Sequence, residues 1–138
     1  MNAEQKLKHL ILNQLATLRS LTFRTDLTVE NIDAEYQFEY ENDSDSFQDA
    51  KAEVRNGEFW TKLDSRQSRI FKSIEVASKA PDGTWIGWTH WFGGGKHDDP
   101  ETIEWIEFAY DVTMTVTEEK ITVTSQTFAK VEPSAGVA

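Results

Sequence analysis

Carboxylate side chains crowd one part of the chain, and their number points to a surface for a cationic partner. Residues 26–58 hold eleven acidic residues and two basic ones, which gives -9 against -10 for the whole 138-residue chain. Such a field attracts basic partners and repels nucleic acid and anionic membranes. The acidity is also compatible with a role in solubility alone. The acids that we expect to meet a protein partner are Glu35, Glu39, Glu41, Asp43, Asp45 and Asp49.

Aromatic residues beside a glycine-rich loop make a second candidate region. Tryptophan is enriched in binding hot spots, so we expect Trp88 and Trp91 to anchor the partner, although such rings also form cores. As an alternative, Trp85 stacks on the base of a nucleotide while the loop holds its phosphate. That loop is Gly93, Gly94, Gly95, Lys96 and His97. It is no P-loop, since the leading glycine and the Ser or Thr after the lysine are absent.

Histidine and carboxylate residues around the same loop offer a third alternative, a catalytic site of His90, His97 and Asp99. No histidine has a recognisable catalytic spacing, and no serine stands in a nucleophile-elbow pattern. His97 with the two aspartates that follow it supplies too few ligands for a defined metal geometry. We therefore expect no catalytic residue, no metal and no cofactor.

The spacing of apolar residues predicts an amphipathic helix over residues 2–19. Asn2 and Gln5 have the three-residue separation of a capping box, which satisfies the free amides at the helix start. The apolar residues recur every three or four positions, so they form one stripe. That stripe is Leu7, Leu10, Ile11, Leu15 and Leu18.

Alternation of apolar and polar residues predicts strands in the rest of the chain. Residues 34–41 alternate most clearly, with Tyr36, Phe38 and Tyr40 on one face and glutamates on the other. Asp99 and Pro100 predict a short helical turn over 100–105. The other predicted strands are 47–55, after a polar turn at 42–46, and then 70–79, 84–92, 106–117 and 120–131.

These elements predict a single α+β domain over residues 1–138, with the N-terminal helix packed on a meandering antiparallel sheet of about six strands. The ordered body is expected to end at residue 131, and residues 132–138 to fray. The chain has no cysteine, which suits a reducing compartment. No apolar run approaches the roughly 18 residues of a membrane span and no signal peptide opens the chain, so we expect a cytoplasmic protein.

The stretch 82–110 resembles a motif of small phage and prophage proteins. Its pattern is tryptophan-rich, then aromatic-Gly-Gly-Gly-Lys-His, then Pro-Glu, then Ile-x-Trp. The matching residues are Trp88, Trp91, Gly93, Gly94, Gly95, Lys96, His97, Pro100, Glu101, Ile103 and Trp105. The resemblance covers about a fifth of the chain. It implies a biological setting but no particular reaction, because small acidic phage proteins often block host enzymes that handle nucleic acid.

Two main hypotheses follow. In the first, the chain is a non-enzymatic acidic protein, encoded by a phage, that inhibits a host defence factor of the restriction or CRISPR type and touches no nucleic acid or membrane itself. In the second, it binds a nucleotide signal through the aromatic cluster and the Gly93–Lys96 loop. The sequence leaves the oligomeric state open, a dimer included.

Overall fold

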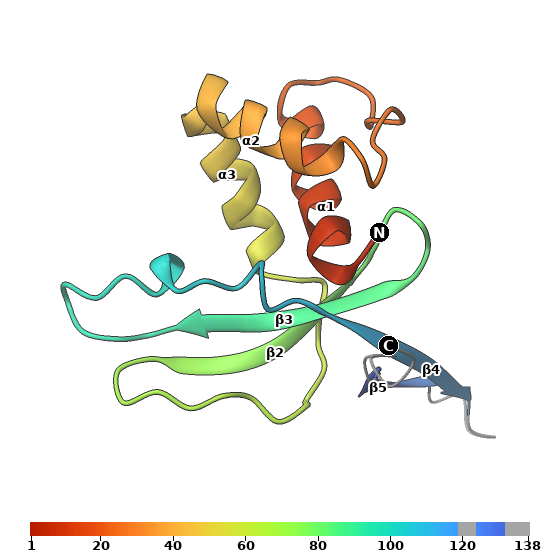
Figure 1. The fold of residues 1–138 in the computed structure, drawn as a ribbon. Helices are drawn as coiled ribbons and strands as arrows, with labels where there is room; N and C mark the ends of the chain where they lie inside the picture. The colour runs from red at the N-terminus through yellow and green to blue at the C-terminus, as the bar shows by residue number, and fades with distance from the viewer. Residues whose placement is uncertain (119–123, 132–138) are drawn as a thin grey trace.

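The computed structural model describes residues 1–118 and 124–131 and shows an α+β fold with a helical layer above an antiparallel sheet (Figure 1). The strand order β1-β2-β3-β4-β5 follows the chain, so the sheet is a meander. This confirms the predicted fold class, with five strands in the described residues rather than six. The helices are α1 (Ala3–Leu18), α2 (Ile32–Asn42), α3 (Ser44–Arg55) and the short 3-10 helix η1 (Pro100–Thr102). The strands are β1 (Phe59–Trp60), β2 (Lys72–Lys79), β3 (Trp85–Phe92), β4 (Tyr110–Glu118) and β5 (Thr124–Lys130).

The first helix forms as its sequence predicts. The Asn2 side chain accepts a hydrogen bond from the Gln5 amide at 2.8 Å, and the Gln5 side chain accepts one from the Asn2 amide at 3.1 Å. This capping box satisfies two of the free amides of the first turn. Leu7, Ile11 and Leu15 are buried, so the apolar stripe of α1 faces the core.

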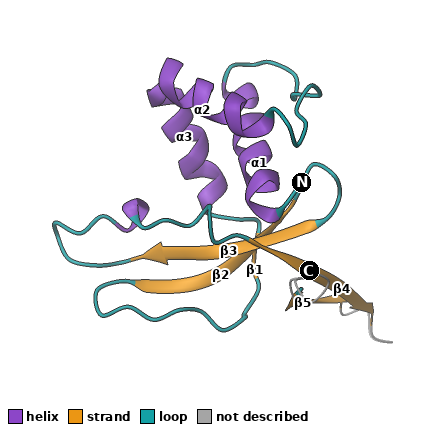
Figure 2. Cartoon of the chain, in the orientation of Figure 1, coloured by secondary structure: helices purple, strands orange, loops and turns teal. Residues whose placement is uncertain are grey.

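The predicted strands 34–41 and 47–55 are both wrong, because these residues form α2 and α3 (Figure 2). In α2, Tyr36 and Tyr40 are one helical turn apart and both pack edge-on against Phe47 of α3. Phe38, which a strand would place beside them, is 56% exposed. Between the two helices, Asp43 caps α3 by accepting a hydrogen bond from the Ser46 amide at 3.4 Å.

The hairpin of β2 and β3 is the centre of the sheet. The two strands pair along their whole length, from Lys72 opposite Phe92 to Lys79 opposite Trp85. The later boundaries differ from the prediction, since β4 begins at Tyr110 rather than 106 and the helical turn closes at Thr102. Residues 119–123, where the predicted last strand begins, and the predicted frayed tail 132–138 lie outside the described residues.

Two hydrophobic clusters lie on opposite faces of this hairpin. The larger cluster fills the space between the helices and the sheet and contains Trp88, Trp105 and Phe47. The smaller one, on the other face, groups Ala77 with Val112 and Phe128 because β4 and β5 curl beneath the hairpin. In the described residues, no helix is both long and apolar enough to cross a bilayer.

A buried carboxylate stabilises the face of the sheet that points away from the helices. Glu75 is 5% exposed and accepts hydrogen bonds from three hydroxyl groups. Tyr110 donates to its Oε1 at 2.6 Å, and Thr89 and Ser65 donate to its Oε2 at 2.8 and 2.6 Å. These bonds tie β2 to β3, to β4 and to the segment that follows β1.

Candidate interaction surfaces

Part of the acidic segment is neutralised by basic residues of the same chain. Lys8, Arg19 and Arg24, in α1 and the segment after it, form salt bridges with five of the eleven acids of residues 26–58. Those five acids are Asp26, Asp33, Glu35, Glu39 and Asp43. Three of the six acids that the sequence predicts for a partner therefore already have a basic neighbour.

The shortest of these contacts joins Arg24 to Asp26, with 2.6 Å between Nη2 and Oδ2. This hydrogen bond lowers the pKa of the Asp26 carboxyl to about 2. The hydrogen bond from Lys8 lowers the pKa of Asp33, and the one from Arg19 lowers the pKa of Asp43. These basic residues thus mainly link α1 to the segment around α2 through salt bridges.

The other three predicted acids stay free of salt bridges within the described residues. Glu41 accepts a hydrogen bond from the Gln37 amide group at 3.0 Å, whereas Asp45 and Asp49 are exposed one turn apart on α3. Because residues four apart share a helix face, these two carboxylates point to the same side of α3.

Acids from a distant part of the sequence join that side. Asp49 and Glu101 of η1 line a cleft of about 190 Å³. Glu104 and Glu107 line a neighbouring cleft of about 350 Å³ together with Tyr36 of α2. We call the exposed carboxylates of Asp45, Asp49, Glu101, Glu104 and Glu107 the anionic face. The two most acidic stretches of the chain therefore meet on one surface, which the linear sequence does not reveal.

A tryptophan whose indole nitrogen has no hydrogen-bond partner is among the residues that line the smaller cleft. Trp105 lines the cleft and is 2% exposed, and its indole Nε1 has no hydrogen-bond partner. Two basic residues of α3 also line the cleft. The Arg55 guanidinium donates to the Trp91 carbonyl at 2.7 Å, and Lys51 lines both this cleft and its neighbour. A buried donor without a partner costs stability, and the indole Nε1 of Trp91 is unpaired in the same way.

The tryptophans predicted to anchor a partner lie inside the protein. Trp88 is fully buried and donates its Nε1 hydrogen to the Arg55 carbonyl at 2.9 Å, while Trp91 is 6% exposed. Trp88 packs 5.7 Å from Trp105, measured between ring centroids. Both side chains therefore belong to the core, and neither is accessible as the partner anchor that the sequence predicts.

The predicted nucleotide site does not assemble either. Trp85 begins β3 and packs against Phe59 and Phe128, while the Gly93–Lys96 loop follows the other end of the strand, about 25 Å away at 3.3 Å per residue. Within the loop, the Asp98 carboxylate accepts the Gly95 amide hydrogen at 2.7 Å. This carboxylate takes the place that a phosphate oxygen would need. Lys96 and His97 are exposed.

The residues of the predicted catalytic alternative have separate structural roles. The Nδ1 atom of His90 lies 3.1 Å from the Arg55 carbonyl oxygen, and burial lowers the pKa of this histidine. His97 is exposed in the loop, and Asp99 caps η1 by accepting the Glu101 amide hydrogen at 3.2 Å. Among the described residues, no group of three or more potential metal ligands occurs.

A cavity of about 660 Å³ between α1, α3 and the end of β2 was not expected from the sequence. Its lining includes Leu10 and Val54 on the apolar side, and His9, Asn13 and Glu53 on the polar side. Each of these residues looks like an ordinary helix residue in the sequence, and only the packing of α1 beside α3 brings them together.

Comparison with known proteins adds no relative. No family model matches the chain, and neither the curated proteins nor the solved structures contain a match.

Proposed function

We propose that the chain is a non-enzymatic interaction protein that binds a basic protein partner through the anionic face. The observation that supports this most directly is the meeting of Asp49 with Glu101 around the Trp105 cleft. An arginine or lysine of the partner would pair with the two carboxylates. Such pairs are charge-assisted hydrogen bonds, which are stronger than those between neutral groups.

The partner class follows from the charge. A protein surface that binds nucleic acid carries basic side chains spaced to meet phosphates. The exposed carboxylates of the anionic face can pair with these side chains in place of the phosphates. The whole chain, at -10, adds long-range attraction to such a surface. We therefore propose a host protein that handles nucleic acid as the partner. The resemblance of residues 82–110 to phage proteins favours a defence factor of the restriction or CRISPR type, met in the host cytoplasm.

Charge reversal tests this proposal. The double variant Asp49→Lys/Glu101→Lys changes the cleft, and Glu30→Lys/Glu58→Lys changes the net charge by the same amount at exposed positions outside the anionic face. Binding is measured to an immobilised short arginine-rich peptide, and inhibition is measured in DNA-cleavage assays with purified restriction and CRISPR nucleases. Circular dichroism checks that both variants keep the helical layer.

The cleft variant is expected to lose about tenfold or more in peptide affinity, because two attractive contacts become repulsive. The control variant should lose much less, and the affinity of the native chain should fall as salt rises. Equal affinities of the two variants would contradict the assignment of the anionic face. If no nuclease is inhibited in proportion to added protein, the inhibitor role is wrong even if the peptide binds.

A further inference from the structure

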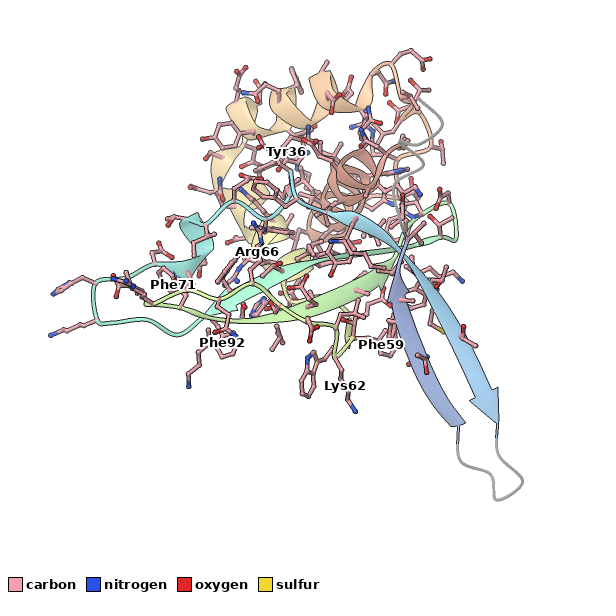
Figure 3. All side chains as sticks on the ribbon, turned by 60° about the horizontal axis from the view of Figure 1, so that its bottom comes forward. Tyr36, Phe59, Lys62, Arg66, Phe71 and Phe92 are labelled. Atoms are coloured by element: carbon pink, nitrogen blue, oxygen red, sulfur yellow. The ribbon has the colours of Figure 1, made fainter. Side chains whose placement is uncertain are left out.

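A cleft of about 550 Å³ lies between the segment 61–71 and the first half of β2, and it shares no lining residue with the two clefts of the anionic face. Figure 3 shows Phe71 and Phe92 near one end of the β2–β3 hairpin, with Arg66 above the strands in this view and Lys62 further along and pointing outward. We call this space the loop–β2 cleft. Its lining includes Trp60, Lys62, Arg66, Phe71, Lys72 and Phe92.

Positive charge predominates in this cleft, in contrast to the chain as a whole. Lys62, Arg66 and Lys72 line it together with a single acid, Asp64. None of these three basic residues takes part in the salt bridges found among the described residues. Lys6 and Lys8 of α1 are paired with acids, whereas the Arg66 guanidinium lies 4.7 Å from the centroid of the Phe108 ring. A contact with a ring does not neutralise the charge, so an external anion can still pair with these residues.

Aromatic rings are accessible beside these charges. Trp60 is 59% exposed and Phe92 is 36% exposed, although large aromatic side chains are normally buried. The Lys62 ammonium group lies 5.8 Å from the centroid of the Trp60 ring. A ring face next to a free cation suits a ligand that is flat and aromatic at one end and anionic at the other.

We propose that the loop–β2 cleft binds a nucleoside phosphate, with the base stacked on Trp60 or Phe92 and the phosphates held by Lys62, Arg66 and Lys72. The volume of the cleft lies within the roughly 300–1,000 Å³ that is common for small-molecule sites. A single nucleotide is favoured over a polymer, because the net charge of -10 repels a long polyanion while three local cations suffice for one phosphate chain. This site is independent of the anionic face.

The test uses a panel of ATP, GTP, CTP and UTP, with calorimetry and tryptophan fluorescence as readouts. Trp60 is the appropriate reporter because, of the five tryptophans of the chain, it is the one that lines this cleft. Lys62→Ala/Lys72→Ala removes two cations from the cleft. Its control, Lys51→Ala/Lys79→Ala, removes the same charge at residues that do not line the cleft. Trp60→Ala, at an exposed position, tests the stacking contact without disturbing the core.

At least one nucleotide should bind and quench the fluorescence. The cleft double variant and Trp60→Ala should each lose about tenfold in affinity, and the control should retain it. Three results would overturn the proposal: no binding of any nucleotide up to about 1 mM, equal affinity of the cleft variant and the control, or tighter binding of a single-stranded oligonucleotide or an acidic peptide than of any nucleotide. None of these results depends on the arginine-rich peptide binding at the anionic face.

Discussion

Removing one hydroxyl group from Tyr110 tests the role of the buried carboxylate. The Tyr110 hydroxyl supplies the hydrogen bond to Oε1 of Glu75, whereas Thr89 and Ser65 both donate to Oε2. The Tyr110 ring also covers Gly87, where an added Cβ would lie 2.8 Å from the ring. Tyr110→Phe keeps this packing and removes only the donor. A hydrogen bond to a buried charged group contributes about 1.5–3 kcal/mol, so we expect the free energy of unfolding to fall by about that amount.

Urea unfolding at neutral pH measures the change, and thermal unfolding checks it. With an unfolding entropy of about 2.1 cal/mol/K per residue, 138 residues give about 0.29 kcal/mol/K, so Tm should fall by about 5–10 °C. Tyr40→Phe is the matched control, because this side chain is 44% exposed and should change stability by less than about 0.5 kcal/mol. If Tyr110→Phe behaves like the control, the Oε1 contact does not stabilise the sheet and the reasoning is refuted.

Two further predictions concern the backbone conformation at two glycines and the stability of the protein at acid pH. Gly57 has φ of 70° and a Cβ there would lie 2.7 Å from the Val76 Cβ, so Gly57→Ala should cost about 2–4 kcal/mol in urea unfolding. Gly83→Ala, with φ of 90° and open space, should cost only about 1–2 kcal/mol, and an equal cost at both positions would contradict the steric argument. The Arg24 contact lowers the pKa of Asp26 to about 2, so the stability it contributes is present above about pH 4 and is lost as the pH falls toward 2. Arg24→Gln should flatten this part of a plot of unfolding free energy against pH, and an unchanged slope would exclude the contact as its cause.

The strand prediction for residues 34–41 failed for a definable reason. An alternating pattern places every even residue on one face of a strand, but Tyr36 and Tyr40 within it are also four apart, as on one face of a helix. The ring that decides between the two is Phe47, eleven residues beyond Tyr36 and part of the next helix. The glutamates beside the tyrosines, at 35, 39 and 41, favour a helix, and Asp43 is a residue type typical of a helix start. Both signals were available in the sequence.

The candidate surfaces were harder to predict than the elements. The acidity of residues 26–58 is evident in the sequence, but which acids remain free depends on where Lys8, Arg19 and Arg24 lie after folding. The exposure of tryptophans could not be predicted either. Trp88 lies in the centre of β3 and is buried, whereas Trp60 belongs to a two-residue edge strand and remains exposed. Composition indicates how many such residues exist, and only tertiary packing determines their partners.

The salt bridges of Arg19 and Arg24 affect how any binding experiment with this protein must be read. Arg24 attaches the segment between α1 and α2, which has no regular secondary structure over residues 21–28, to Glu35 of α2, and Arg19 links the end of α1 to Glu39 of α2. Raising the ionic strength weakens such contacts even when no partner is present. A loss of affinity at high salt therefore has two sources, one at the interface and one in the conformation of the free protein. Only a parallel record of helix content against ionic strength separates them.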